Sequence, residues 1–107
     1  MYVIVIITCP DNESAEKISG VILGQRLAAC VNIAKDIKSF FWWGKRRKKI
    51  HSAEEMMLFV KTKQSLLRKL IREVKKVHPY SVPEIIALPI VGGSKEYTQW
   101  IEEETRN

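Results

Sequence analysis

Two long segments of strand-forming residues flank a short run of positive charge in the middle of this chain. The first segment extends from Leu27 to Trp43, with a less regular stretch at 32–38 that suggests a bulge or bend. Gly44 and the basic run at 45–49 then form a turn, and Met56 to Val60 begins the return strand. The pattern predicts a long β-hairpin that projects from the domain.

A strand and a helix are predicted before the hairpin. Tyr2 to Thr8 is a β-branched run without polar alternation, which is typical of a strand covered on both faces. Pro10 interrupts it, and either Asp11 or Asn12 can cap the helix that follows. The apolar face of this helix consists of Ala15, Ile18, Val21 and Ile22.

A second helix is predicted after the hairpin. Thr62 or Ser65 can cap it, and Pro79 ends it because the residue before a proline avoids the α region. Its apolar stripe consists of Leu66, Leu67, Leu70, Ile71, Val74 and Val77.

A fourth strand and a last helix complete the chain. Pro83 opens the strand from Glu84 to Val91, and Pro89 within it implies an edge or bulged position. After a Gly-Gly turn, Ser94 can cap the last helix. That helix carries Tyr97, Trp100 and Ile101.

The order of elements, β-α-β-β-α-β-α, predicts an α/β fold of the α+β kind: a ferredoxin-like βαββαβ unit plus a C-terminal helix, in one domain over residues 1–107. Two helices would cover one face of a four-stranded antiparallel sheet. The strands carry too many apolar residues for the other face to be wet. We therefore expect other subunits to bury that face.

Composition narrows the class of protein. No apolar run approaches the ~18–20 residues that a membrane-spanning helix needs. The first residues lack the basic region of a signal peptide, so we expect a cytoplasmic protein. The two cysteines, Cys9 and Cys30, form no C-x-x-C pair, which argues against a redox motif. The net charge is +6. Outside the basic run the chain has 13 basic and 12 acidic residues, so the rest of the domain is nearly neutral.

Six short motifs, in the right order and on the expected elements, resemble one family over essentially the whole chain. They are Thr8-Cys9-Pro10-Asp11, the stretch from Arg26 to Asn32, Phe41-Trp42-Trp43, Lys61-Thr62, the stretch from His78 to Glu84, and the stretch from Tyr97 to Trp100. The family is CutA, the divalent-cation tolerance proteins. The resemblance implies a ferredoxin-like homotrimer clamped by its hairpins, with a shape similar to PII signalling proteins. It also implies binding of divalent cations, copper above all. The sequence shows no Ser-His-Asp, Cys-His or paired-carboxylate arrangement, so we expect no enzymatic activity.

The chain departs from the family pattern at two positions thought to bind copper. Ile7 stands where some members have a cysteine, and Val77 where some have a second histidine. Cys9 lies on the same strand face as Ile7 and could substitute for it. The hairpin tip is basic, where many members have an acidic one.

His78 and Cys9 are the candidate metal ligands. A neutral imidazole suits copper or zinc, but one histidine is not a site, and a trimer would have to bring further ligands together. The alternative is that His78 caps the C-terminus of its helix. Cys9, at a strand end, is either an exposed ligand or a buried thiol, whereas Cys30 is expected in the core.

Tyr80, Lys61 and Glu84 are the candidate residues of a small-molecule cleft, in keeping with PII-like sensing as the alternative function. Tyr80 stands in a loop beside His78. Lys61 could bind an anion or a carboxylate such as Glu84, or could simply be solvated. The tryptophans and the other tyrosines more often pack a subunit interface than line a cleft.

Other functions have weaker support. The basic run could bind nucleic acid, but it is more typical of a solvated turn, and the chain has no RNP-type aromatic motif. It could also dock protein partners of a structural trimer. An acylphosphatase-like enzyme would need an arginine-bearing phosphate loop, where this chain has Cys9-Pro10-Asp11. Glu102, Glu103 and Glu104 are expected to be solvated or to pair with the basic run of a neighbour.

Overall fold

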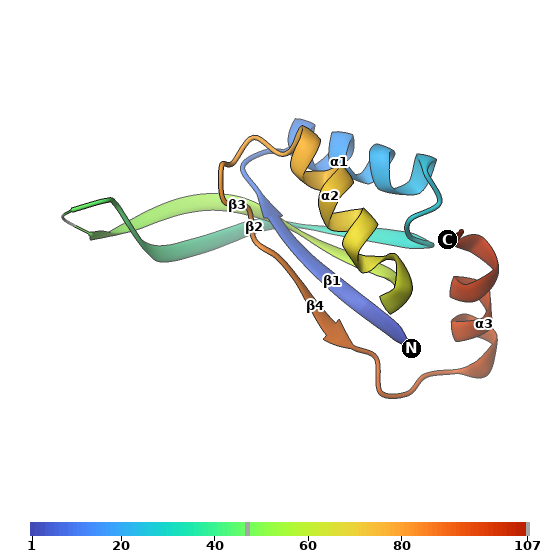
Figure 1. Ribbon diagram of the computed structural model, residues 1–107. Coiled ribbons are helices and arrows are strands. Elements are labelled where there is room, and N and C mark those ends of the chain that lie inside the picture. The colour runs from blue at the N-terminus through green and yellow to red at the C-terminus, as the bar shows by residue number, and fades with distance from the viewer. Residues whose placement is uncertain (47, 107) are drawn as a thin grey trace.

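The computed structural model describes residues 1–46 and 48–106. Seven main elements follow one another in the predicted order, with one short 3-10 turn, η1, before the second helix (Figure 1). They are β1 (Tyr2–Cys9), α1 (Asn12–Gly24), β2 (Cys30–Trp43), β3 (Lys49–Lys63), η1 (Gln64–Leu66), α2 (Leu67–Val77), β4 (Ile85–Pro89) and α3 (Lys95–Glu104).

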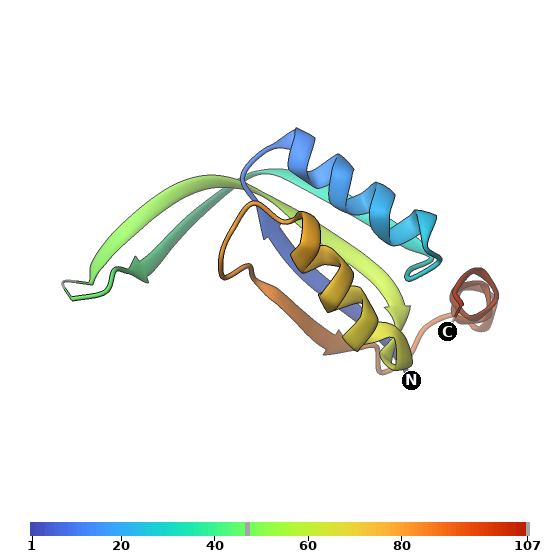
Figure 2. The same cartoon turned by 45° about the horizontal axis from the view of Figure 1, so that its top comes forward.

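The four strands form one antiparallel sheet in the order β2-β3-β1-β4, which confirms the ferredoxin-like fold. Helices α1 and α2 lie side by side on one face of the sheet (Figure 2). The core lies between them and the sheet. Its fully buried side chains include Val5, Ile7, Leu58 and Val60 from the strands and Ile18, Ile22, Leu70 and Val74 from the helices.

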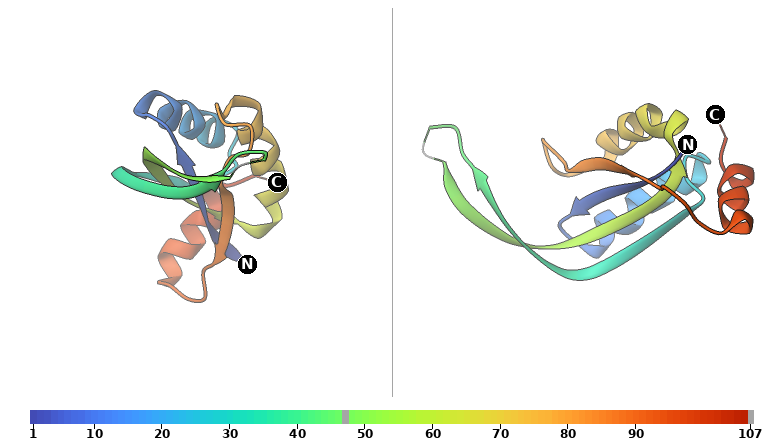
Figure 3. Two further views of the ribbon diagram at one scale, coloured as in Figure 1. Left: turned by 90° about the vertical axis from the view of Figure 1, so that its left-hand side faces the viewer. Right: turned by 90° about the horizontal axis from the view of Figure 1, so that it is seen from below.

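The opposite face of the sheet, here called the open face, lies away from α1 and α2 (Figure 3, right). Ile6 pairs with Ile86, and Ile4 pairs with Leu88, so these four side chains share that face. Ile86 is 51% exposed and Leu88 49% exposed. The predicted apolar second face is therefore present in the folded subunit.

The hairpin projects as predicted, and the molecule measures 48 × 26 × 24 Å. The pairing of β1 with β3 stops at Cys9 and Met56, while β2 and β3 continue together to Trp43 and Lys49 (Figure 1). The predicted bulge is confirmed: the register shifts between Ala34 and Ile37. Of the basic run, Arg47 lies outside the described residues, and the remaining four side chains are exposed.

Two strand boundaries differ from the prediction. β2 begins at Cys30 and not at Leu27, because the chain turns at Arg26, whose φ is 59°, and the Leu27 N–H bonds the Ile22 carbonyl. The return strand β3 begins at Lys49, seven residues before Met56, since cross-strand pairing extends to the tip. β4 is shorter than predicted, and Pro89 ends it on an edge strand as expected.

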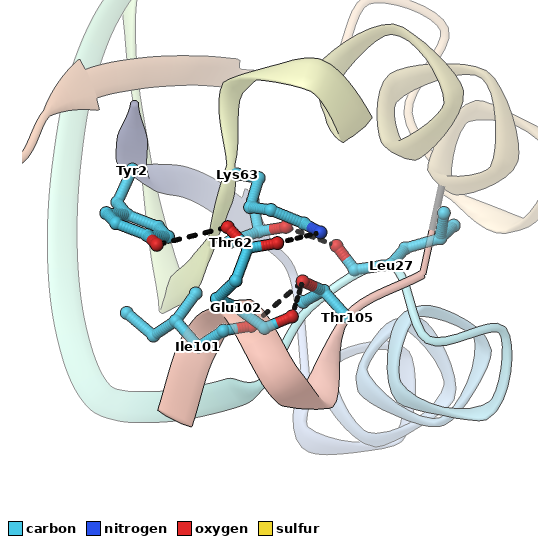
Figure 4. Close-up of polar contacts among 7 residues, drawn as sticks. All are labelled: Tyr2, Leu27, Thr62, Lys63, Ile101, Glu102 and Thr105. Atoms are coloured by element: carbon cyan, nitrogen blue, oxygen red, sulfur yellow. Dashed lines mark hydrogen bonds and ion pairs between the residues drawn. The ribbon is translucent and has the colours of Figure 1, made fainter. Parts of the chain in front are cut away.

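Two of the predicted helix caps form as expected. The Asp11 carboxylate accepts a 2.8 Å hydrogen bond from the Ser14 N–H, which lowers the pKa of Asp11, and the Ser94 hydroxyl accepts one from the Tyr97 N–H. Thr62 is not a cap. It is fully buried, and its hydroxyl donates a 2.6 Å hydrogen bond to the Leu27 carbonyl (Figure 4).

Helix α3 lies at the end of the sheet opposite the hairpin (Figure 1). Glu102 fixes it there by accepting hydrogen bonds from the Tyr2 hydroxyl at 3.1 Å and from Lys63 Nζ at 2.9 Å (Figure 4). Glu104 pairs with Arg26 at 3.5 Å. Two of the three terminal carboxylates therefore have basic partners within their own chain.

None of the described helices is long and apolar enough to cross a membrane.

Candidate functional site

A cleft of about 800 Å³ lies where the hairpin leaves the sheet. Its walls come from the hairpin on one side and from the loop between α2 and β4 on the other. The lining residues are Ser39, Phe40, Phe41, Trp42, Trp43, Ala53 and Glu55 of the hairpin, and Pro79, Tyr80, Ser81, Val82 and Glu84 of the loop. Tyr80 and Glu84, both predicted from the sequence, thus line one cleft.

His78 holds the loop against the sheet and is only 8% exposed. The Tyr80 N–H donates a 3.1 Å hydrogen bond to Nδ1 of His78, and Nε2 lies 2.8 Å from the Thr8 carbonyl oxygen. Because the amide can only donate and the carbonyl can only accept, the imidazole is neutral with its proton on Nε2. The ring therefore bonds β1 and does not cap α2. At the end of α2, the main-chain N–H of His78 donates a hydrogen bond to the Val74 carbonyl.

Tyr80 contacts a carboxylate that sequence reasoning missed. Its hydroxyl donates a 2.7 Å hydrogen bond to Oε2 of Glu55, which is 8% exposed. Burial, together with this hydrogen bond, raises the pKa of Tyr80 above its ordinary value. The sequence did not single out Glu55, because its hydrogen-bond partner Tyr80 lies 25 residues away in the chain.

Cys9 is fully buried, with its Sγ 3.7 Å from the Asp11 carbonyl oxygen. Burial raises the pKa of this thiol to about 11, and the Asp11 and Glu55 carboxylates add to the shift. With this pKa, Cys9 is a protonated thiol at neutral pH. Metal binding requires the thiolate form, so an ion at Cys9 would have to displace the proton.

Lys61 lies apart from the cleft. It pairs with Ile4 on β1 and with Cys30 on β2, whereas Glu84 adjoins the end of β4 that pairs with Ile7. The Nζ of Lys61 is 4.0 Å from Cys30 Sγ. Cys30 itself is half-buried on the open face, so the expectation that it lies in the core was wrong.

The donor set of one subunit does not fit a resident metal ion. Within residues 1–46 and 48–106, no three His, Cys, Asp or Glu side chains stand close enough together to hold one. Both His78 nitrogens are engaged, and the Cys9 thiol is protonated. The assignment of His78 and Cys9 as metal ligands stays a prediction.

Comparison with known proteins identifies the family. The family model described as CutA1 divalent ion tolerance protein matches residues 3–104. The chain belongs to the CutA1 family. The sequence motifs implied this family of divalent-ion tolerance proteins.

Solved CutA structures share the fold closely. Cut A1 from Thermus thermophilus is 42% identical, with a TM-score of 0.94 over 99% of this chain and 100% of that one. CutA from Archaeoglobus fulgidus, described as periplasmic, is 44% identical, with a TM-score of 0.91 over 97% and 98%.

Plant relatives are longer. The chloroplastic CutA 1 of Oryza sativa is 42% identical over 97% of this chain, and the chloroplastic CutA of Arabidopsis thaliana is 44% identical over 98%. The chain spans only 57% and 56% of those two proteins, respectively.

Proposed function

We propose that this CutA1 chain works as a homotrimer that binds divalent cations, copper first among them. The observation that carries the proposal is the family match over residues 3–104. The Thermus thermophilus and Archaeoglobus fulgidus relatives are named divalent-cation tolerance proteins.

The open face supports a trimer. Ile86 and Leu88 are about half exposed in one subunit, beside Ile4 and Ile6 on the same face. Burying such side chains contributes ~25 cal/mol per Å² of apolar surface, so a subunit with this face uncovered gains by association. Other copies of the chain are the proposed cover.

His78 and Cys9 are the proposed metal ligands, with any further donors coming from a neighbouring subunit. An ion at His78 would displace one of the two hydrogen bonds of the imidazole. An ion at Cys9 would release the proton of a thiol whose pKa is about 11. Binding should therefore strengthen as the pH rises. The ion would therefore bind reversibly, in competition with these hydrogen bonds and this proton.

Copper(II) affinity, measured by competition with a chelator, tests the metal proposal. We compare the wild type with His78→Ala and Cys9→Ser, and with His51→Ala as a control, because His51 is exposed on the hairpin. A wild-type Kd below about 1 μM, equivalent to about −8 kcal/mol, that weakens only in the first two variants supports the proposal. Equally weak binding by all four proteins contradicts it.

A second candidate function is PII-like sensing of a small molecule. The cleft favours it, because its volume is in the range of ligand pockets and Tyr80 and Glu84 line it. Lys61 does not line the cleft of its own subunit, so its proposed part in ligand binding requires a neighbouring subunit.

The partners and the compartment are proposed on narrower grounds. The exposed part of the basic run, at the hairpin tip, is the proposed contact for protein partners. The cytoplasm is the proposed compartment, because both cysteines are free thiols, which suit a reducing environment.

A further inference from the structure

We propose that the outer side of α2 docks an acidic, extended segment of another protein, whose carboxylates pair with a row of basic side chains. The row, here called the α2 stripe, consists of Arg68, Lys69, Arg72, Lys75 and Lys76. This inference goes beyond the functions proposed above, because it uses neither the cleft, nor a metal ligand, nor the hairpin tip.

The α2 stripe occupies one side of its helix. All five of its side chains are exposed, whereas Leu70 and Val74, on the opposite side, are fully buried in the core. With 3.6 residues per turn and a rise of 1.5 Å per residue, the five positions fall within an arc of about 120° and span about 12 Å along the helix axis. The stripe is therefore one continuous strip of positive charge.

Assembly through the open face leaves the α2 stripe accessible. Helices α1 and α2 lie side by side on the face of the sheet that is turned away from the open face, so their outer sides still meet solvent when open faces pack together (Figure 2). Beside the stripe, α1 contributes Glu13, Glu16 and Lys17, a net charge of −1 against +4 for α2. The helical side of the subunit is thus positive in the assembly as well.

Glu73 is the only acidic residue of α2, and both of its oxygens are engaged. Oε2 lies 2.8 Å from Lys76 Nζ and 3.7 Å from Arg72 Nε, and Oε1 accepts a hydrogen bond from Gln25. Two side chains of the stripe thus already converge on a carboxylate. The same chemistry is available to the carboxylates of a partner.

Three members of the α2 stripe lack a counter-charge. Arg68, Lys69 and Lys75 form no ion pair with any of the described residues. Outside the stripe and the basic run at 45–49, eight basic residues remain against twelve acidic ones. The excess positive charge of the chain is therefore confined to these two places, and only the stripe lies on a helix.

The helix itself gains little from this arrangement. Arg68 and Lys69 lie in the first turn of α2, where the helix dipole is positive and no acidic residue offsets them. Arg72 stands four residues from Arg68 and from Lys76, a spacing at which like charges repel. Only Lys75 and Lys76, in the last turn, suit the dipole. Charge that opposes local stability is expected where it serves binding.

The surroundings and composition of the stripe favour a polypeptide over other polyanions. Because α1 lies beside it, α2 does not protrude as a helix must to enter the major groove of DNA. The stripe has no aromatic side chain on which the bases of a single strand could stack, and no apolar side chain to insert into a membrane. An extended peptide needs neither, and about four of its residues match the length of the stripe.

Fluorescence anisotropy of a labelled octaglutamate peptide, titrated with the full chain at pH 7 and low salt, tests the proposal. The stripe variant combines Arg68→Gln, Lys69→Gln and Lys75→Gln, which leaves the ion pairs of Glu73 in place. We expect it to bind the peptide at least about tenfold more weakly than the wild type does. It should unfold at the same temperature as the wild type or higher, because the charges that it loses repel one another.

The matched control combines Lys45→Gln, Lys48→Gln and Lys49→Gln, which removes the same number of positive charges from the exposed hairpin tip. We expect this tip variant to bind within about twofold of the wild type. Equal losses in the two variants would mean that net charge alone attracts the peptide, and would overturn the proposal. A loss in the tip variant alone would also overturn it, and would support the partner contact proposed at the tip.

Three further results would overturn the proposal. The first is no binding of octaglutamate by the wild type, and the second is a lower unfolding temperature of the stripe variant, which would give the stripe a structural role. The third is tighter binding of a single-stranded DNA octamer, or of phosphatidylglycerol vesicles, than of octaglutamate. Sedimentation equilibrium of the same samples shows whether the assembly is intact, so failure of this docking surface is distinguishable from failure of the proposed trimer.

Discussion

The imidazole of His78 donates a 2.8 Å hydrogen bond from Nε2 to the main-chain carbonyl of Thr8, seventy residues earlier in the chain. The Nδ1 of the same ring accepts from the Tyr80 N–H. One buried side chain thus joins the end of β1 to the loop that carries Tyr80 into the cleft.

His78→Ala should lower the free energy of unfolding by about 1–3 kcal/mol, because it leaves the buried Thr8 carbonyl without its donor. Urea denaturation monitored by circular dichroism measures the change. The control is His51→Ala, since His51 is exposed on the hairpin. Equal losses in the two variants would mean that the His78 bonds add no stability.

Thr62→Val should be destabilising although the two side chains have nearly the same shape. Thr62 is fully buried, and its hydroxyl donates to the Leu27 carbonyl at 2.6 Å. Loss of the donor should cost about 1–3 kcal/mol. Thr98→Val is the comparison, because water can replace its exposed hydrogen bond to the Ser94 carbonyl. Thermal denaturation should rank Thr62→Val well below Thr98→Val, and the reverse order would refute this role.

The Glu102 contacts predict a pH-dependent contribution to stability. Hydrogen bonds from Lys63 and then Tyr2 hold the pKa of Glu102 below its usual range. A lowered folded-state pKa contributes stability that is fully present above the unfolded-state value of about 4.3 and is lost as the pH falls through the folded-state pKa. The stability gap between wild type and Glu102→Gln should therefore be constant above about pH 5 and shrink in acid.

Denaturant unfolding between pH 7 and pH 3 measures that gap. Glu103→Gln is the control, because the Glu103 carboxylate accepts its hydrogen bond from the neutral amide of Gln99 and not from a lysine. A gap that stays constant down to pH 3 would show that Glu102 is not held by Lys63 in solution.

Cys9 should resist alkylation in the folded, metal-free protein. It is fully buried and its thiol pKa is about 11, so little thiolate exists at pH 7. Iodoacetamide followed by mass spectrometry should modify Cys9 only after unfolding in guanidinium. Rapid modification of Cys9 in the native protein would contradict its placement in the core.

Local signals in the sequence predicted most of the fold. The apolar periodicities indicated the element order, the side chain of Asp11 indicated a cap, and the irregular stretch at 32–38 indicated the bulge. Each of these depends on residues close together in the chain. The start of β2 was misplaced because the turn at Arg26 is closed by a hydrogen bond between Leu27 and Ile22, which strand propensity does not report.

The site was harder to predict because its contacts span the chain. Strand register decides three of these contacts. They are the Tyr80–Glu55 bond, the Thr62–Leu27 bond and the separation of Lys61 from Glu84. The burial of Cys9 and the partial exposure of Cys30 also depend on which face of the sheet each residue occupies. The sequence motifs singled out the loop that lines the cleft, but not the carboxylate that Tyr80 bonds there.

The mass of the assembly in dilute solution tests the central claim most directly. Sedimentation equilibrium of the wild type should give about 37 kDa, three times the 12.4 kDa of one chain. Ile86→Arg places a charge on the open face and should give monomers, whereas Leu23→Arg, on helix α1, should not. A wild-type mass near 12.4 kDa, or an Ile86→Arg variant that still sediments as a trimer, would contradict assembly through the open face.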